Sequence, residues 1–185
     1  MRAAIVLAAG RSRRFGARDK LVVRYRGRLL AEHAIRTALR SDCARVLVVM
    51  RTMSPLKRLP LLKSPRISTV EVPPENASRR QSLAAALRAL RPLERSALVL
   101  LGDMPALDIG QVRKVARSSP RSDARAIYRG QPGHPVLIRN PRAALARLTD
   151  GKPALAVDRL QNLPTGRGAI ADIDRPPALR PVPVR

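Results

Sequence analysis

The chain opens with residues 1–21, MRAAIVLAAGRSRRFGARDKL. Its segment Ala3–Ala9 is an unbroken run of small and branched apolar residues, which is typical of a strand buried on both faces of an α/β sheet. The run ends at Gly10, and arginines and a lysine crowd the residues that follow. A glycine-bearing loop at the carboxyl end of a buried strand can bring backbone N–H groups and cationic side chains to a phosphate. The stretch therefore predicts a strand followed by a polyphosphate-binding loop.

Two other interpretations of this opening segment stay open. It can be a plain basic surface loop, since it lacks the G-x-x-x-x-G-K-[ST] spacing of a P-loop and the G-x-G-x-x-G spacing of a dinucleotide fold. Arg2 before a short apolar run also resembles the start of a secretory signal peptide. Against that, the run is at the lower limit of such a core, and a dense cationic segment follows it directly.

Length and composition indicate one domain with a single sizeable core, because the chain has 185 residues of which 45% are hydrophobic. We expect this domain to cover residues 1–175 and the proline-rich segment 176–185 to be a loose tail. No apolar stretch approaches the ~20 residues that span a membrane. The lone Cys43 excludes an intramolecular disulfide, so a cytoplasmic location is expected. One cysteine and two histidines are also too few for an ordinary zinc site.

The charge balance is extreme: 37 lysines and arginines face 13 acidic residues, a formal net charge of +24. Such a charge predicts attraction to polyanions, including nucleic acid, anionic membrane surfaces and nucleotides. Only Phe15, Tyr25 and Tyr128 are aromatic, so the chain offers no stacking platform for single strands. The basic residues are also spread over the whole chain. A nucleotide substrate is therefore favoured over nucleic acid, which stays an alternative.

Strands and helices alternate along the rest of the chain. Further strands are expected at Arg45–Met50, Ile67–Val72, Ser96–Leu101, Ala124–Tyr128, Pro135–Ile138 and Ala169–Ile173. Helices are expected at Leu29–Leu39, Ser78–Leu90, Asp108–Ala116, Pro141–Leu148 and Val157–Leu163. Prolines allow only short helices between Ser54 and Ser64. The alternation predicts an α/β fold with a mostly parallel sheet, whose ligands bind at the carboxyl ends of the strands.

Three groups of polar residues are candidates for chemistry. Asp103 directly follows the strand Ser96–Leu101, where a carboxylate can hold Mg²⁺ against nucleotide oxygens or simply cap the following turn. Asp172 and Asp174 share one face of an extended segment, so they can complete a metal site or form a solvated strand end. His134 is expected in a rigid turn, where it can contact an anionic substrate or serve a structural role.

Four motifs together resemble the MobA-like nucleotidyltransferases, and within them the molybdenum cofactor cytidylyltransferases. They are LAAGRSRRFG (residues 7–16) with Lys20, GDMP (102–105), GHPVL (133–137) and DID (172–174). The resemblance covers Arg2 to about Pro176. It implies a Rossmann-like three-layer α/β/α domain that transfers a nucleotidyl group from an NTP, with CTP expected, to the terminal phosphate of the molybdenum cofactor. It also implies Mg²⁺ as cofactor, and molybdenum hydroxylases or their maturation factors as partners.

The resemblance also implies roles for individual residues. Catalysis would involve Arg14, Lys20 and Asp103. The nucleotide would be bound by Leu7, Ala8, Ala9, Gly10, Arg11, Ser12, Arg14, Lys20, Ser82, Gly102 and Asp103. Gly133 and His134 would contact the acceptor substrate, and Asp103, Asp172 and Asp174 would hold the metal.

The sequence departs from the family pattern in three places. Phe15 stands where methionine is usual, arginines enter the segment Ser78–Leu83 near the expected base pocket, and Lys152 stands near an expected glycine. The departures affect the residues expected to recognise the nucleotide base and the acceptor substrate. GTP as donor, or another phosphorylated acceptor, therefore stays an alternative.

Overall fold

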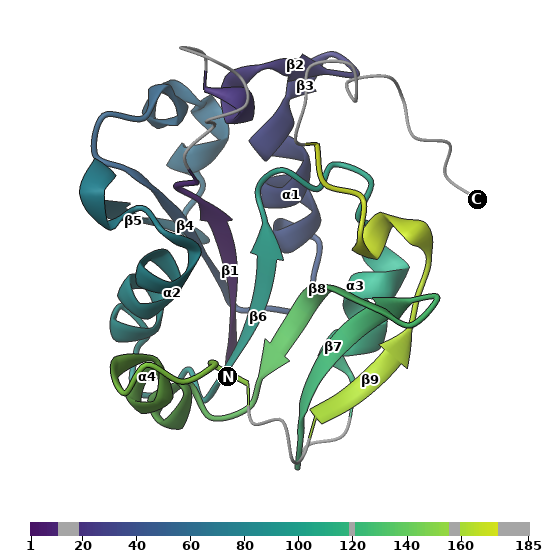
Figure 1. Cartoon of the computed structure of the whole chain (residues 1–185). Helices are drawn as coiled ribbons and strands as arrows, with labels where there is room; N and C mark the ends of the chain where they lie inside the picture. Colours follow the sequence, from purple (N-terminus) through teal and green to yellow (C-terminus); the bar gives the residue numbers. More distant parts are fainter. Residues whose placement is uncertain (11–18, 119–120, 156–159, 174–185) are drawn as a thin grey trace.

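The computed structural model describes residues 1–10, 19–118, 121–155 and 160–173. A seven-stranded sheet runs through the molecule in the order β5-β4-β1-β6-β8-β7-β9 (Figure 1). Its strands are β1 (Arg2–Ala8), β4 (Arg45–Arg51), β5 (Ile67–Val72), β6 (Ser96–Leu101), β7 (Asp123–Tyr128), β8 (Gln131–Ile138) and β9 (Leu160–Pro164). The first four in spatial order are parallel, β8 runs antiparallel to β6 and β7, and β9 is parallel to β7. The expectation of a mostly parallel sheet is confirmed.

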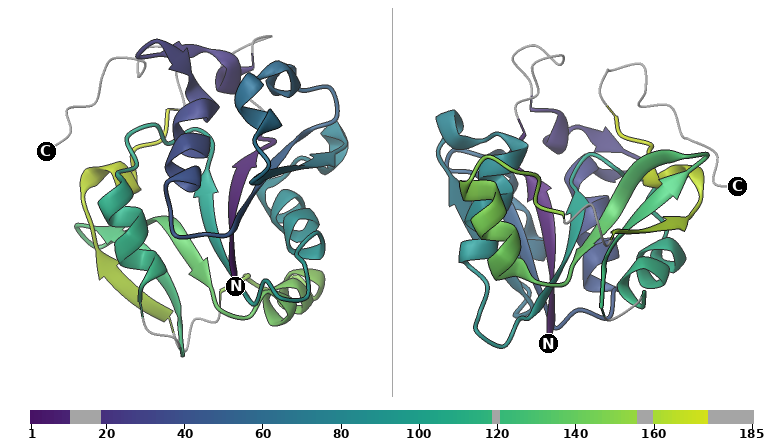
Figure 2. Two further views of the ribbon diagram at one scale, coloured as in Figure 1. Left: turned by 180° about the vertical axis from the view of Figure 1, so that it is seen from behind. Right: turned by 60° about the horizontal axis from the view of Figure 1, so that its bottom comes forward.

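Helices cover both faces of this sheet (Figure 2). The helices α1 (Leu30–Leu39) and α3 (Ile109–Ala116) pack on one face, and α2 (Arg79–Arg88) and α4 (Pro141–Thr149) pack on the other. In β1, Ala4 and Val6 belong to the core of the first face, whereas Ala3 and Ile5 belong to the core of the second. Both cores need apolar partners from the same strand, which explains its unbroken apolar sequence. The fold is the expected Rossmann-like three-layer α/β/α arrangement.

Side-chain caps fix where three of the helices begin. The Ser78 hydroxyl accepts a hydrogen bond from the Gln81 amide (3.2 Å) at the start of α2. The Asp108 carboxylate accepts from Gly110 N at 2.7 Å in front of α3. Ahead of α4, the Asn140 side chain accepts from Ala143 N. Each bond satisfies an amide that has no partner within its own helix.

Short 3₁₀ helices and a hairpin complete the connections. Two 3₁₀ helices, η3 (Pro55–Arg58) and η4 (Pro60–Lys63), fill the proline-rich stretch where only short helices were expected. Three more are η2 (Lys20–Val22), η5 (Pro74–Asn76) and η7 (Arg167–Ala169). A small hairpin, β2 (Arg24–Tyr25) and β3 (Arg28–Leu29), precedes α1.

The expected turn at His134 is wrong, because β8 already begins at Gln131. The turn lies earlier, at Arg129 and Gly130, whose φ angles of 48° and 79° suit a two-residue hairpin between β7 and β8. Pro132 and Pro135 are tolerated in β8 because its ladder to β6 involves only Val136–Ile138. His134 is therefore held within the sheet.

Two further expectations near the end of the chain are wrong. Residues 160–163, expected to close a helix, belong to β9, which pairs with the free edge of β7. Residues 156–159 lie outside the described part of the chain. The strand expected at Ala169–Ile173 is absent, since Ala169 ends η7 and residues 171–173 have no regular structure. The predicted tail 176–185 lies outside the described residues, so its boundary stays a prediction.

Across the described ranges, no helix combines the length and apolar character that crossing a bilayer would require.

Candidate functional site

Lys20 and Asp103 form an ion pair at the carboxyl ends of the parallel strands. The Lys20 Nζ donates to Asp103 Oδ2 at 2.6 Å, and the two side chains are only 10% and 16% exposed. Asp103 follows the end of β6, and Lys20 opens η2 after the loop that leaves β1. Residues 83 positions apart thus meet because β1 and β6 are neighbouring parallel strands. The site combines a cation and a carboxylate in a partly dehydrated position, where both act strongly on a charged ligand.

Two neighbouring residues fix the backbone at Lys20. The Asp19 carboxylate caps η2 by accepting from Leu21 N, and it also accepts from Arg51 Nη2 at 2.5 Å. Arg51 is the last residue of β4, the strand on the other side of β1. Lys20 is therefore held from both sides of β1. On the β6 side it pairs with Asp103, and on the β4 side Arg51 holds the preceding residue, Asp19.

The end of the described chain closes over the same pair. Ile173 N donates to the Asp103 carbonyl at 3.0 Å, and the Ile173 carbonyl accepts from Lys20 Nζ at 3.2 Å. The Ile173 side chain is buried against Tyr25 and Leu30. These contacts bring the segment that contains Asp172 next to Asp103, as a shared metal site would require. Asp172 is exposed, and Asp174 lies outside the described residues.

The donor atoms at this point suit a hard divalent cation. Asp103 Oδ2 and the Ile173 carbonyl both lie within hydrogen-bond distance of one ammonium group, so oxygens already converge on a positive charge. No described residue donates a hydrogen bond to Asp103 Oδ1. Carboxylate and carbonyl oxygens are the ligands that Mg²⁺ and Mn²⁺ prefer. Within the described ranges, however, no three His, Cys, Asp or Glu side chains gather into a complete metal site.

The end of β1 lies directly against the turn that carries Asp103. Gly102 N donates to the Leu7 carbonyl at 2.9 Å, and a Cβ added at Gly102 would come within 3.2 Å of the Ala8 Cβ. Ala8 and Ala9 are buried, whereas Gly10 is exposed with open space around it. Small residues on both strands therefore let the turn after β6 approach the start of the cationic loop.

Gly133 and His134 enter the site from β8. Gly133 is buried, and a Cβ there would overlap the carbonyl of Ala169 in η7. His134 keeps part of its surface exposed, yet its pKa is lowered from 6.5 to about 4. Burial is the main cause and the Arg79 charge the second, while the Asp103 charge partly opposes the shift. His134 is therefore near enough to both charges to respond to them, and it is neutral at pH 7.

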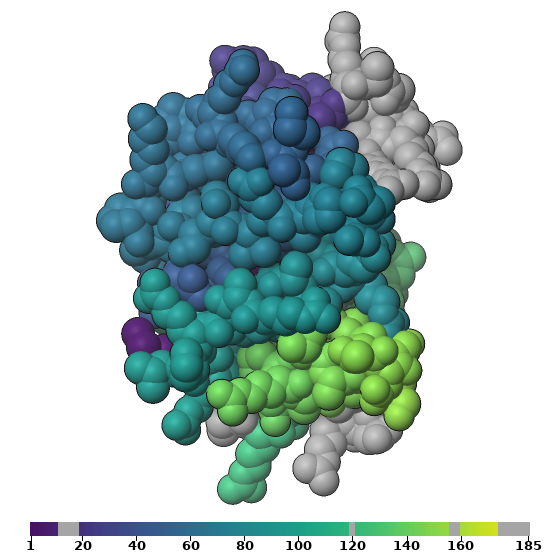
Figure 3. All heavy atoms as spheres, turned by 90° about the vertical axis from the view of Figure 1, so that its left-hand side faces the viewer, coloured from purple at the N-terminus to yellow at the C-terminus, as the bar shows by residue number. Residues whose placement is uncertain are grey.

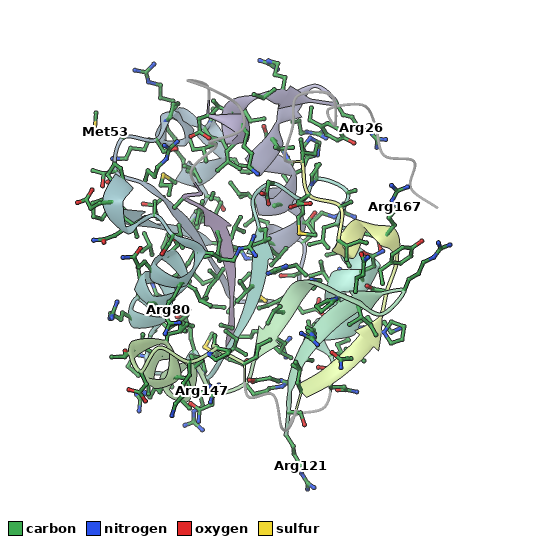
Figure 4. The ribbon with its side chains drawn as sticks, in the orientation of Figure 1. Arg26, Met53, Arg80, Arg121, Arg147 and Arg167 are labelled. Atoms are coloured by element: carbon green, nitrogen blue, oxygen red, sulfur yellow. The ribbon has the colours of Figure 1, made fainter. Side chains whose placement is uncertain are left out.

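The first turn of α2 contains Ser82 and the unexpected arginines. Ser82 is buried, and its hydroxyl has no hydrogen-bond partner among the described residues. Arg80 donates to the carbonyls of Leu148 and Gly151, so it caps the carboxyl end of α4, where a cation is favourable. Figure 4 shows the Arg80 side chain beside α4. Of the two arginines that follow Ser78, only Arg79 acts on the site, through His134.

The structure thus brings together Lys20, Gly102, Asp103, His134 and the end of β1 (Leu7–Ala9). Arg11, Ser12, Arg14 and Asp174 lie outside the described residues, so their predicted roles stay predictions. Sequence reasoning missed Asp19, Arg51 and the Ile173 carbonyl, and it named Arg79 only among the arginines near the expected base pocket. Asp19, directly before Lys20, is a recognisable helix-capping signal, whereas the other contacts depend on which strands become neighbours.

Comparisons with known proteins give the family and the fold of the chain. Residues 4–163 match the family described as MobA-like NTP transferase domain. The fold is similar to that of Rv0371c from Mycobacterium tuberculosis, with a TM-score of 0.77, 21% identity, and 96% and 95% of the two chains covered.

Two other solved structures share the fold. A nucleotidyl transferase from Methanothermobacter thermautotrophicus has a TM-score of 0.74 and 20% identity, with 95% of this chain and 92% of that chain covered. A 4-diphosphocytidyl-2C-methyl-D-erythritol synthase from Anaerococcus prevotii has a TM-score of 0.75 and 15% identity, with 96% and 94% covered. A search of curated proteins finds no match to the chain.

Proposed function

This chain belongs to the MobA-like NTP transferase family, and from that premise we propose that it transfers CMP from CTP to the terminal phosphate of the molybdenum cofactor, releasing pyrophosphate. Nucleotidyl transfer is the activity of the family; the donor base and the acceptor are the proposal. The observation that supports it most is the Lys20–Asp103 pair, 2.6 Å apart at the carboxyl ends of β1 and β6. Lys20 suits a phosphate oxygen, and Asp103 suits a divalent cation.

The chemistry explains why such a sparse site suffices. A phosphate monoester is ionised at neutral pH, so it needs neither a nucleophilic side chain nor a strong general base. The barrier lies in bringing two anions together and aligning the attack on the α-phosphorus, which positioning and cationic groups lower. In this proposal Arg14 and Lys20 neutralise the triphosphate, and the loop amides after Gly10 hold its oxygens.

The metal is the second part of the proposal. One structure of Rv0371c is a complex with manganese, at 19% identity to this chain. We assign Mg²⁺ to Asp103, assisted by Asp172 or Asp174, because Ile173 hydrogen-bonds to the Asp103 carbonyl and so brings this segment beside it. When bound, the ion would supply positive charge to the phosphate oxygens.

The acceptor is assigned to the side of the site formed by β8. His134 carries no charge at pH 7, because its pKa is about 4. A neutral imidazole can accept or donate one hydrogen bond without attracting a further anion. Arg79 beside it supplies charge for the acceptor phosphate. Molybdenum hydroxylases or their maturation factors are the partners that would receive the product.

The test is a pyrophosphate-release assay with each of the four NTPs and isolated molybdenum cofactor. We expect release with CTP, and loss of about 10²–10³-fold in rate for Asp103→Asn, by analogy with other single electrostatic groups. Asp42→Asn is the matched control, because that exposed carboxylate only pairs with Arg113 and Arg117. Its rate should stay unchanged.

Each other outcome overturns a defined part of the proposal. Release with GTP alone would replace the donor, and release with a different phosphorylated acceptor would replace the acceptor. If no NTP and acceptor yield pyrophosphate, while RNA binds with a steep salt dependence and no metal requirement, the chain is a nucleic-acid-binding protein on a transferase scaffold.

A further inference from the structure

A cavity opens at the opposite end of the sheet from Lys20 and Asp103. Its volume is about 740 Å³, and it lies between the end of α2, the segment Arg91–Arg95 and the start of α4. Arg95 precedes β6 and Arg139 follows the antiparallel β8, so both flank the amino end of the parallel strands. Figure 3 shows the teal atoms of α2 and its following segment directly above the green atoms of α4. This cavity is therefore separate from the catalytic edge.

Five arginines line this cavity, and we call it the arginine pocket. They are Arg88, Arg91, Arg95, Arg139 and Arg142. The one carboxylate in the lining, Glu94, is already engaged: Arg45 binds both of its oxygens at 2.8 and 2.6 Å, and the Arg91 amide adds a bond of 2.7 Å. Glu94 is thus bound by Arg45, which lies outside the lining, and it also feels the charge of Arg91. The lining therefore holds five arginines against one carboxylate that is already engaged.

Four of the five guanidinium groups are open to a ligand. Arg88, Arg91, Arg95 and Arg142 are exposed, and no described residue forms an ion pair or hydrogen bond with their side chains. Arg139 is half-buried: its Nη2 donates to the Ser118 carbonyl at 2.5 Å, and the Asp123 carboxylate is close enough for its charge to act on the guanidinium. Arginine binds phosphate through two parallel hydrogen bonds, so this cluster can hold more than one phosphate group.

The rest of the lining favours a compact organic ligand over a nucleic acid. Leucine and proline side chains contribute apolar surface: Leu87, Leu90, Pro92, Pro141 and Leu145. The volume falls within the range of about 300–1,000 Å³ that is usual for small-molecule sites. The lining holds no aromatic ring on which a nucleic-acid base could stack. The amino end of α4 also opens here and adds to the positive potential.

We propose that the arginine pocket binds a small organic molecule that carries two or more phosphate groups, independently of the catalytic site. The apolar side chains would contact its organic part, and the arginines would contact its phosphates. Since Arg91 and Arg95 flank Glu94, whose carboxylate binds Arg45 of β4, an occupant would also contact the segment that links α2 to β6.

The experiment is calorimetric titration of inorganic tripolyphosphate into the full chain, without divalent metal and at about 150 mM salt to suppress diffuse attraction. We expect two binding events in the unchanged protein. Arg91→Gln with Arg142→Gln should weaken one of them by about tenfold or more, which corresponds to about 1.4 kcal/mol. Lys20→Met should weaken only the other.

The control pair is Arg40→Gln with Arg58→Gln, two exposed arginines outside the pocket whose side chains have no described partner. It should leave both events within twofold. Equal weakening by the control pair, or two unchanged events in the Arg91 and Arg142 variant, would refute the pocket. Binding of a 20-nucleotide RNA at least tenfold tighter than tripolyphosphate, lost with Arg91 and Arg142, would assign the surface to nucleic acid instead.

Discussion

At the scale of single residues, the site depends on groups that are costly to separate. Lys20 is only 8% exposed, and its ammonium contacts Asp103 and the Ile173 carbonyl. Removing one partner of such a pair leaves the other as a poorly solvated charge. His134 is the opposite case, a titratable group that its surroundings keep neutral. Replacing one partner should therefore disturb the Lys20–Asp103 pair, whereas a change in nearby charge should shift the pKa of His134.

The charge of Arg79 should help to keep His134 neutral. Burial is the main cause of the low pKa, near 4, and the charge of Arg79 is the second. Arg79→Gln should therefore raise the pKa of His134, and Asp103→Asn should lower it further, as NMR titration of the imidazole would show. Because the unfolded chain binds a proton near pH 6.5 and the folded chain does not, His134 should make folding less stable as the pH falls from 6.5 toward 4. An unchanged midpoint in both variants would contradict the assignment.

Gly133 should be intolerant of any side chain. A Cβ at this position would overlap the Ala169 carbonyl, so Gly133→Ala should destabilise the fold by about 1–3 kcal/mol, as overpacking does. Gly10→Ala is the matched control, because nothing lies within 4 Å of the Cβ it would add. Its unfolding free energy should change by less than about 0.5 kcal/mol. Urea unfolding measures both, and equal values would disprove close packing at Gly133.

Some residues of the candidate site could be predicted from the sequence and others could not. Lys20, Gly102 and Asp103 could be found, because each stands directly after an apolar strand or its loop. Arg51 could not, since its bond to Asp19 exists only when β4 and β1 are neighbours. The Ile173 carbonyl is a backbone atom, and no residue type announces its contact with Lys20.

At the scale of helices and strands, the hydrophobic pattern of the sequence predicted the parallel strands of the sheet and the helices that cover it. The strands β1, β4, β5 and β6 and the four α-helices were anticipated, because each buries an apolar run or stripe. The errors lie at the antiparallel end. Residues 160–163 carry leucines three positions apart, which is typical of a helix, but they pair with the edge of β7 as a parallel strand. Pairing between distant segments overrides local preference there.

The Glu94–Arg45 contact joins two of these elements and should stabilise them in a pH-dependent way. Burial alone would raise the pKa of Glu94, but the hydrogen bonds and charges of Arg45 and Arg91 outweigh it and hold the pKa below its usual 4.5. A lowered carboxylate pKa stabilises the fold above pH 4.5, and this stabilisation is lost as the pH falls below it. Glu94→Gln should therefore cost about 1.5–3 kcal/mol at pH 7 and less at pH 3.

Glu71→Gln is the control for that experiment. Glu71 pairs with Lys57 at 2.8 Å, but both side chains are more than 40% exposed. An exposed pair of this kind contributes less than about 1 kcal/mol. Chemical unfolding at both pH values compares the variants. If the Glu94 variant loses as little as the Glu71 variant, the buried contact is not the stabilising element we describe.

At the scale of the whole molecule, positive charge is distributed rather than gathered. Figure 4 shows Arg26, Arg121 and Arg167 at separate places on the outline. With 37 basic and 13 acidic residues, most cations lack an acidic counterpart. The sequence predicted the spread of charge, but it did not predict the arginine pocket. That cluster forms only where α2 and α4 meet beside the start of β6.

Mutual repulsion should make the fold sensitive to salt. Raising sodium chloride from about 20 to about 300 mM should raise the thermal unfolding midpoint by a few degrees, because screening weakens repulsion between exposed charges. Replacing the exposed Arg28, Arg40 and Arg58 by glutamine should reduce this increase. Scanning calorimetry at several salt concentrations measures it. A midpoint that ignores salt in both proteins would show that repulsion has little weight in the fold.

The bonds from Ile173 to Lys20 and Asp103 have a consequence for synthesis on the ribosome. The parallel strands can assemble once β6 has left the exit tunnel. Ile173, which bonds to the Lys20 ammonium and to the Asp103 backbone carbonyl, emerges about seventy positions later. A nascent chain would thus form the parallel part of the sheet well before Ile173 can close over Lys20 and Asp103.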